Sequence, residues 1–167
     1  MYYQLPLEQL ARRTDGRPQI DFAREALALL DESDDVRFKP TPRGLALYGA
    51  DEASLARPAA VLADRYGPEV QLRTPRVCYL PGRPLQEPVM AVKVTVRREH
   101  LSALMRELRR REALIEEECL RRWVFIVRAR APLALLLGLG NRLASLTDGT
   151  AAFAMRLSHY APVPRHG

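Results

Sequence analysis

The sequence predicts an α+β fold made of two domains in tandem. In the second half, some segments alternate apolar and polar residues as strands do, and others repeat apolar residues every three or four positions as helices do. The first half has the same order of segments. Between the halves, Leu80-Pro81-Gly82-Arg83-Pro84 contains residues that interrupt regular structure. We therefore expect one domain over residues 1–82 and a second over residues 83–167.

The second half begins with a strand and a helix. One face of the strand at residues 89–96 is apolar: Met90, Val92, Val94 and Val96. The next apolar residues follow helical spacing: Leu101, Leu104, Met105 and Leu108. Glu107 and Arg111 lie four positions apart on this helix, in the favourable order for a pair on its surface.

A hairpin is expected next, with strands at residues 113–119 and 123–131. The alternation in the second strand assigns Trp123, Phe125 and Val127 to the face that packs in the core. Successive side chains of a strand point to opposite faces, so the three glutamates at 116–118 are not expected on a single face. We expect them to pair across the hairpin with Arg128 and Arg130.

A helix and a strand complete the second half. Pro132 suits the first turn of a helix, and Gly149 is expected to end that helix. Residues 150–160 then form a strand with inward apolar residues at Phe153, Met155 and Leu157. The resulting order, βαββαβ, is that of a ferredoxin-like domain.

The first half repeats this order less clearly. The segments expected are a strand at residues 2–7, a helix around residues 22–30, a hairpin from residues 36–39 and 45–48, a helix at about residues 57–66, and extended segments at residues 70–72 and 77–79. Pro58 has no backbone N–H, so the regular part of the second helix is expected to start there. The prediction for the whole chain is two ferredoxin-like βαββαβ domains.

No catalytic, cofactor or metal site is expected from the sequence. There is no G-x-x-x-x-G-K-[ST] loop to hold a nucleotide, and Gly138-Leu139-Gly140 follows an apolar helical run rather than a strand. The three histidines are far apart, and Cys78 and Cys119 lack the spacing of metal ligands. We also expect a cytoplasmic protein with reduced thiols, because the sequence has no signal-peptide pattern and no apolar run of membrane-spanning length.

Several short segments of the second half resemble the fifth, C-terminal domain of elongation factor G-type translational GTPases. In chain order these are Glu87-Pro88-Val89-Met90, Arg109-Arg110-Arg111, residues 127–133, Leu146-Thr147-Asp148-Gly149 and His159-Tyr160. The first half resembles the third domain of the same family more faintly, through residues 22–27, 47–52 and 74–79. The resemblance implies two ferredoxin-like domains and a role connected with the ribosome.

The departures from the family also bear on function. Glu112 and a residue around Ala151 replace family glycines, and the glycine-rich turn of the third domain is reduced to residues 49–54. The sequence contains no GTPase domain, no β-barrel domain and no fourth domain between the two matching halves. By the resemblance, such a chain cannot translocate tRNA by the family mechanism.

Positive charge is concentrated in the second half. Residues 1–80 contain 11 Lys and Arg against 12 Asp and Glu, and residues 81–167 contain 15 against 8. In a ferredoxin-like domain both helices cover one face of the sheet, so basic residues out of register with the core should lie on the other face. We expect Lys93, Arg128, Arg130 and Arg156 there. A second basic group, at the ends of elements, is formed by Arg109, Arg110, Arg121 and Arg122.

Two classes of function remain open from the sequence. The first is a non-enzymatic, ribosome- or rRNA-binding protein that contacts the large subunit through these basic residues. The aromatic pair with which an RNA-recognition sheet stacks bases is absent from the strands, where only Tyr160 is near. The second is a protein-interaction module that forms homodimers or acts with a separate GTPase. A small-molecule enzyme is a third, weaker alternative, because no converging polar set is visible.

Overall fold

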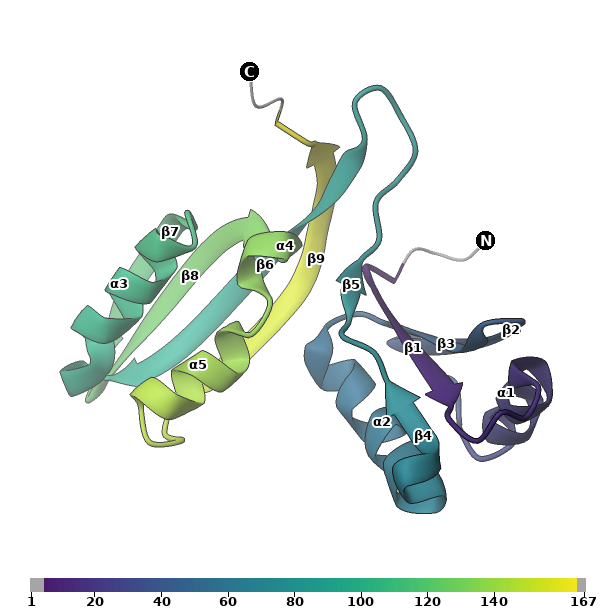
Figure 1. Ribbon diagram of the computed structural model, residues 1–167. Coiled ribbons are helices and arrows are strands. Elements are labelled where there is room, and N and C mark those ends of the chain that lie inside the picture. The colour runs from purple at the N-terminus through teal and green to yellow at the C-terminus, as the bar shows by residue number, and fades with distance from the viewer. Residues whose placement is uncertain (1–4, 165–167) are drawn as a thin grey trace. The chain divides into compact units, whose positions relative to one another are not determined.

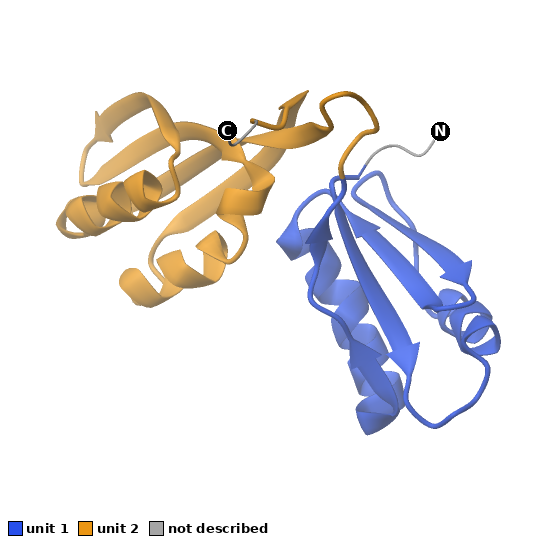
Figure 2. Cartoon of the chain, turned by 45° about the horizontal axis from the view of Figure 1, so that its top comes forward, with its two compact units in different colours: residues 1–78 blue, residues 79–167 orange. Residues whose placement is uncertain are grey.

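The computed structural model describes residues 5–164, which form two compact units, residues 1–78 and residues 79–167 (Figure 2). Each unit contains an antiparallel sheet packed against helices, and each has the βαββαβ order. The sheet order is β2-β3-β1-β4 in the first unit, where β5 also pairs with β1, and β7-β8-β6-β9 in the second (Figure 1). Two ferredoxin-like domains, as predicted, therefore make up the chain.

Residues 5–78 of the first unit contain five strands and three helical segments. They are β1 (Leu7–Arg13), α1 (Gln19–Leu27), β2 (Val36–Thr41), β3 (Gly44–Gly49), α2 (Glu52–Tyr66), the 3₁₀ turn η1 (Gly67–Glu69), β4 (Val70–Leu72) and β5 (Arg76–Val77). The register pairs Leu7 with Gly49 and Ala11 with Leu45, so the alternating apolar residues share one face. Helices α1 and α2 contact the strands. Fully buried residues such as Phe22 and Leu62 fill the space between the layers.

Two predictions for the first unit were wrong. The first strand starts at Leu7, where the expected strand at residues 2–7 ends, and residues 1–4 lie outside the described part. Helix α2 starts at Glu52 and contains Pro58, because Asp51 caps its N-terminus and accepts a 2.8 Å hydrogen bond from the backbone N–H of Ser54. This cap and the burial of Leu55 stabilise the first turns. They outweigh the hydrogen bond lost at Pro58.

The second unit is built around one long strand. Its elements are β6 (Gln86–Arg97), the 3₁₀ turn η2 (Arg98–His100), α3 (Leu101–Arg110), β7 (Leu114–Arg121), β8 (Val124–Pro132), α4 (Leu133–Leu136), α5 (Leu139–Leu146) and β9 (Ala152–Pro162). Strand β6 lies in the middle of the sheet between β8 and β9. Its predicted inward residues are all buried: Met90, Val92, Val94 and Val96. The helices lie on that one face of the sheet (Figure 1).

Two details of the second unit differ from prediction. Trp123 is not in the core; it is 85% exposed, because β8 starts one residue later and Trp123 belongs to the turn. The helix after Pro132 is broken at Leu137 and Gly138, where the glycine has a φ of 81°. The second part ends with Asp148 in a left-handed conformation, and the N–H of Gly149 donates to the carbonyl of Ala144.

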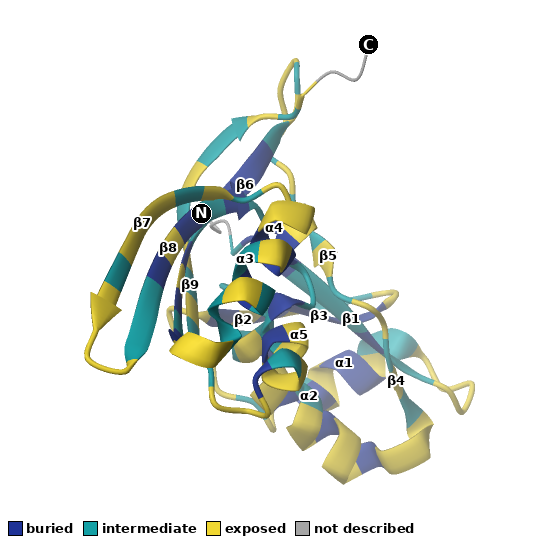
Figure 3. Ribbon diagram, turned by 90° about the vertical axis from the view of Figure 1, so that its left-hand side faces the viewer, coloured by how far each residue is buried: buried dark blue, intermediate teal, exposed yellow. Residues whose placement is uncertain are grey.

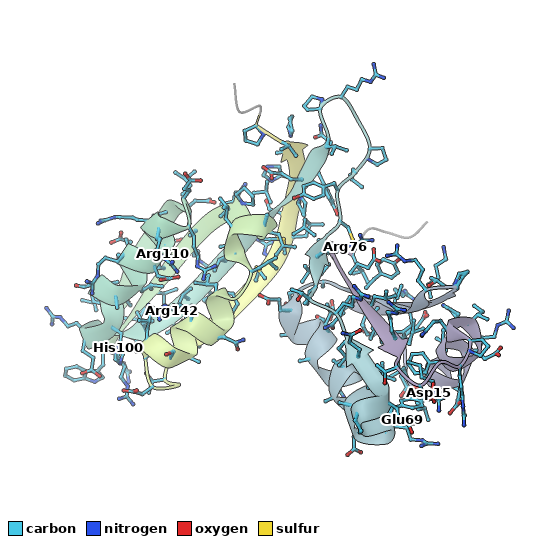
Figure 4. The ribbon with its side chains drawn as sticks, viewed as in Figure 1. Asp15, Glu69, Arg76, His100, Arg110 and Arg142 are labelled. Atoms are coloured by element: carbon cyan, nitrogen blue, oxygen red, sulfur yellow. The ribbon has the colours of Figure 1, made fainter. Side chains whose placement is uncertain are left out.

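A buried ion cluster ties the helices of the second unit together. The Glu107 side chain is only 5% exposed and accepts hydrogen bonds from Arg110 Nη2 at 2.6 Å and Arg111 Nε at 2.9 Å. Arg142 Nε of α5 lies 3.6 Å from the same carboxylate, and Figure 4 shows Arg110 and Arg142 on the neighbouring helices. The predicted Glu107–Arg111 pair is therefore confirmed, but it is largely buried rather than on the surface.

Arg111 also links α3 to the break between α4 and α5. Its Nη1 donates to the carbonyl oxygens of Leu135 at 3.0 Å and Leu137 at 2.8 Å. These are carbonyls that the interrupted helix does not pair. Burial alone would raise the pKa of Glu107, but the hydrogen bonds and charges of Arg110 and Arg111 hold it below its usual value.

Replacing Gly44 should destabilise the first unit strongly. Gly44 has a φ of 139°, and a Cβ there would overlap the backbone carbonyl oxygen of Ala11. Gly44→Ala is expected to lower the free energy of unfolding by about 3 kcal/mol, from backbone strain plus steric overlap. Gly16→Ala is the control, because Gly16 has a φ of 81° with open space around it and should cost only about 1 kcal/mol. Urea unfolding followed by far-UV circular dichroism measures both, and equal losses would contradict the packing argument.

Removing the Glu107 charge should destabilise the second unit more than removing an exposed one. Glu107→Gln is expected to cost about 2–3 kcal/mol, since a neutral amide replaces the buried carboxylate and the guanidinium groups lose their counter-charge and one of two acceptor oxygens. The control is Glu116→Gln, whose carboxylate pairs with Arg130 but is 39% exposed, so it should cost less than about 1 kcal/mol. The same unfolding assay applies, and a Glu116 effect as large as the Glu107 effect would refute the assignment.

The Glu107 cluster also predicts a dependence of stability on pH. The folded-state pKa of Glu107 is lowered, so its contribution is complete above the unfolded pKa of about 4.3 and is lost as the pH falls through the lower folded value. The difference in unfolding free energy between the wild type and Glu107→Gln should shrink as the pH falls below about 4.3. Unfolding titrations between neutral and acidic pH measure that difference, and a difference that stays constant would contradict the cluster.

Candidate nucleic-acid interface

Among the described residues of the second unit, the helices lie on one face of the sheet and none of them covers the other face. Residues of β6 alternate between the covered face, with Val92 and Val94, and the open face, with Ala91, Lys93 and Thr95. Figure 3 shows this contrast between buried and exposed positions along the strands. Side chains of β8 and β9 that pair with these open-face residues lie on the same side. The strand register therefore decides which basic residues are available to a ligand.

The register brings the four predicted sheet residues to the open face. Lys93 lies directly opposite Arg128 of β8 and Ala154 of β9. Ala91, two residues earlier, lies between Arg130 and Arg156 in the same way. These four side chains, Lys93, Arg128, Arg130 and Arg156, are named the basic sheet face below. Like charges directly opposite each other destabilise a sheet, so the Lys93–Arg128 pair is unfavourable by itself.

Two glutamates partly neutralise the basic sheet face. Arg130 Nε lies 2.6 Å from Glu116 Oε1, and Arg128 Nε lies 3.5 Å from Glu117 Oε2. Consecutive residues normally point to opposite sides, but the pairing of β7 with β8 shifts between Ile115 and Glu117. This bulge lets both glutamates reach arginines of the open face. The predicted pairing across the hairpin is confirmed for Glu116 and Glu117, and the bulge makes it possible for both, whereas Glu118 lies opposite Val127.

Lys93 and Arg156 remain without such partners. Both are exposed, and among residues 5–164 neither has a carboxylate within ion-pair distance. Their neighbours across the sheet, Ala91 and Ala154, have small side chains. An extended polyanion can therefore approach the strand backbone closely at this place. Of the basic sheet face, these two cations are the ones whose charge is fully available.

The second predicted basic group is not one cluster. Strand β7 runs parallel to β6, so Arg109 and Arg110, at the end of α3, lie near the start of β7, while Arg121 and Arg122 follow its end. The eight residues of β7 span about 25 Å. Arg110 is also bound to Glu107. The four arginines are exposed, but they lie at opposite ends of the domain.

One basic residue of the open face was missed by the sequence analysis. Arg97 pairs in register with Val124, and Val124 pairs with Arg121 on its other side. Arg97 and Arg121 therefore lie on the same face as Lys93. The signal was present in the sequence, because the alternation that places Lys93 outward continues through Thr95 to Arg97.

The histidines and cysteines of the described part lie apart from one another in the sequence and form no metal-binding group there. No group of three or more His, Cys, Asp and Glu residues between 5 and 164 has the geometry to hold a metal ion. His100 has Glu99 at 3.6 Å, and His159 contacts Ser158 at 3.0 Å; His166 lies outside the described residues. Burial and the nearby Glu8 raise the pKa of the Cys78 thiol to about 11, which disfavours the reactive thiolate. Over the same range, no helix has the length and apolar character needed to cross a membrane.

Comparison with known proteins places the second domain in a family. The family model "Elongation factor G C-terminus" matches residues 84–166. An elongation factor G from Granulibacter bethesdensis is 36% identical over 85 residues, which are 51% of this chain and 12% of that protein. "Ribosome-releasing factor 2, mitochondrial" from Danio rerio is 40% identical over 82 residues, 49% of this chain and 11% of that protein. The chain thus matches a small part of each relative.

A solved structure resembles nearly the whole chain in fold. The crystal structure of ttk003000868 from Thermus thermophilus aligns with 98% of this chain and 42% of its own, at a TM-score of 0.69 and 19% identity. At that identity the likeness concerns the fold alone. The sequence match and the βαββαβ topology agree over the same residues of the second half. The second domain, at residues 84–166, therefore belongs to the elongation factor G C-terminal family.

Proposed function

We propose that this chain is a non-enzymatic, elongation factor G-like protein that binds rRNA of the large ribosomal subunit through the basic sheet face. The single observation that carries the proposal is the pair of unneutralised cations, Lys93 and Arg156, on the uncovered sheet of an elongation factor G C-terminal domain. The family match supports a ribosomal context, and the charge supports a polyanionic partner.

The arrangement of charge suits a phosphate backbone. Arg128 and Arg130 are held by Glu117 and Glu116, so their positions are restrained before any ligand arrives. Lys93 and Arg156 lie beside them on the next strands, and when they neutralise phosphates the RNA releases the counterions condensed on it. Binding also relieves the repulsion between Lys93 and Arg128. Affinity should therefore be strongly dependent on salt.

The proposal includes no GTPase activity. The sequence contains no loop of the G-x-x-x-x-G-K-[ST] type, with which P-loop GTPases hold the nucleotide phosphates. The first domain, in this proposal, corresponds to the third domain of elongation factor G. Its support is the sequence resemblance at residues 22–27, 47–52 and 74–79 together with the ferredoxin-like topology.

A protein-interaction role is the second candidate, and strand β7 favours it. This strand lies at the edge of the sheet, where backbone groups are free to pair with another chain. Leu114 and Leu120 on it are exposed. A homodimer or a complex with a separate GTPase through this edge is an alternative to RNA binding. The two candidates differ in partner and in their response to salt.

Co-sedimentation with purified ribosomes across a salt series tests the RNA-binding proposal. Lys93→Ala and Arg156→Ala should each weaken binding and reduce the slope of log affinity against log salt by about 1. Arg106→Ala is the matched control. It removes the same charge from an exposed position on α3, on the helix side of the same domain, and should change affinity less than about twofold.

Three outcomes would contradict the proposal: no sedimentation at low salt, binding that is insensitive to salt, or an Arg106 variant as weak as the Lys93 variant. The protein-interaction role is tested by measuring the mass of the protein in solution by analytical ultracentrifugation. A stable dimer that is lost in Leu120→Ser, together with no ribosome binding, would favour the interaction role.

A further inference from the structure

The hairpin between β7 and β8 ends in a turn made of Arg122 and Trp123. Strand β7 stops at Arg121 and β8 starts at Val124, which pair with each other, so only these two residues connect the strands. Trp123 is 85% exposed, and the hairpin tip is drawn as exposed in Figure 3. A large aromatic side chain is thus exposed to solvent at the tip of this hairpin.

Neither residue is what the turn itself requires. Arg122 has a φ of 54°, a left-handed conformation that glycine, asparagine or aspartate adopts at lower cost in a two-residue hairpin. An exposed tryptophan leaves a large apolar surface in contact with water. Exposed residues that are locally unfavourable in a turn are typical of a binding site.

The surroundings of Trp123 are cationic. Arg122 precedes Trp123 in the turn. Arg121 and Arg97 lie opposite Val124, the residue after Trp123, on the two neighbouring strands. Among the described residues, neither Arg121 nor Arg122 has a carboxylate at ion-pair distance, and Arg97 has only Glu99 at 3.9 Å. An exposed aromatic residue next to arginines in the turn and at the ends of the adjoining strands fits a partner with flat apolar faces and negative charge. Single-stranded nucleic acid has both.

An apolar protein partner fits this tip less well. The other exposed apolar residue nearby, Leu120, pairs with Phe125 and so lies on the opposite face of the hairpin from Arg121. Leu120 therefore does not share a face with Arg121 and Arg97. A protein contact would use Leu120, whereas a nucleic-acid contact would use the arginine side.

We propose that the hairpin tip, with Trp123, Arg121, Arg122 and Arg97, binds an unpaired base of single-stranded RNA. The base stacks on the indole of Trp123, and the guanidinium groups bind the flanking phosphates. This inference rests on the proposed rRNA binding and adds to it the kind of RNA element recognised. It also supplies, outside the strands, the stacking aromatic that the open sheet face lacks.

Intrinsic fluorescence tests the stacking directly, because Trp123 is the one tryptophan of the sequence. The full chain is titrated with single-stranded oligoadenylate and, separately, with polyphosphate, which has charge but no bases. Oligoadenylate should quench the emission as it binds, and polyphosphate should bind without comparable quenching. Equal quenching by both, or no quenching by oligoadenylate, would overturn the proposal.

Variants measured by fluorescence anisotropy of a labelled oligonucleotide give the second arm. Trp123→Ala should weaken binding roughly 5- to 150-fold, the range expected for one stacked base, and Trp123→Phe should recover most of it. Leu120→Ser is the control and should leave RNA affinity unchanged. A loss with Leu120→Ser as large as with Trp123→Ala would point to a protein-binding hairpin instead.

The two proposals fail in different ways. Ribosome co-sedimentation that persists in Trp123→Ala, with no quenching by oligoadenylate, would overturn the hairpin inference and leave the basic sheet face standing. Quenching and RNA binding that depend on Trp123, without ribosome association at low salt, would overturn the proposed function and leave the stacking site. Far-UV circular dichroism of each variant verifies the fold, since Trp123 contributes little to the core.

Discussion

The handedness of the crossover connections decides which surface of each domain is free. In the second unit, β6–α3–β7 and the connection from β8 through α4 and α5 to β9 both join parallel strands. They start from antiparallel strands and move in opposite directions across the sheet. With the same right-handed sense, both must pass over the same face. The core forms there, and the basic sheet face lies on the side that these connections leave uncovered.

Period-two alternation made much of this arrangement predictable. The run from Met90 to Arg97 assigns each side chain of β6 to a face, and the register with β8 and β9 extends that assignment to the basic sheet face. The failures came where a local effect outweighed the pattern. Trp123 continues the alternation of β8 but falls in the turn, because a two-residue connection takes it out of the strand. Pro58 lies inside α2 because the Asp51 cap starts the helix well before it.

The sequence pattern did not predict which ion pairs would be buried. Glu107 with Arg111 and Glu116 with Arg130 both look like surface pairs in the sequence. In the structure the first is closed off between α3 and α5, with Arg111 also holding backbone carbonyls, and the second is half open to solvent on the sheet. The first pair therefore belongs to the architecture of the helical layer. The second shapes the charge of the open face, and only three-dimensional packing separates the two roles.

The bulge in β7 means that the charge of the basic sheet face depends on the number of residues in this strand as well as on their identity. Loss of one codon within the run Glu116-Glu117-Glu118 would restore regular pairing with β8 and leave a single carboxylate facing Arg128 and Arg130. The surface would become more positive without the gain of any basic side chain. Relatives whose β7 is one residue shorter at this point are therefore expected to bind polyanions more strongly. A sequence alignment that places no gap at the bulge would hide this difference in length.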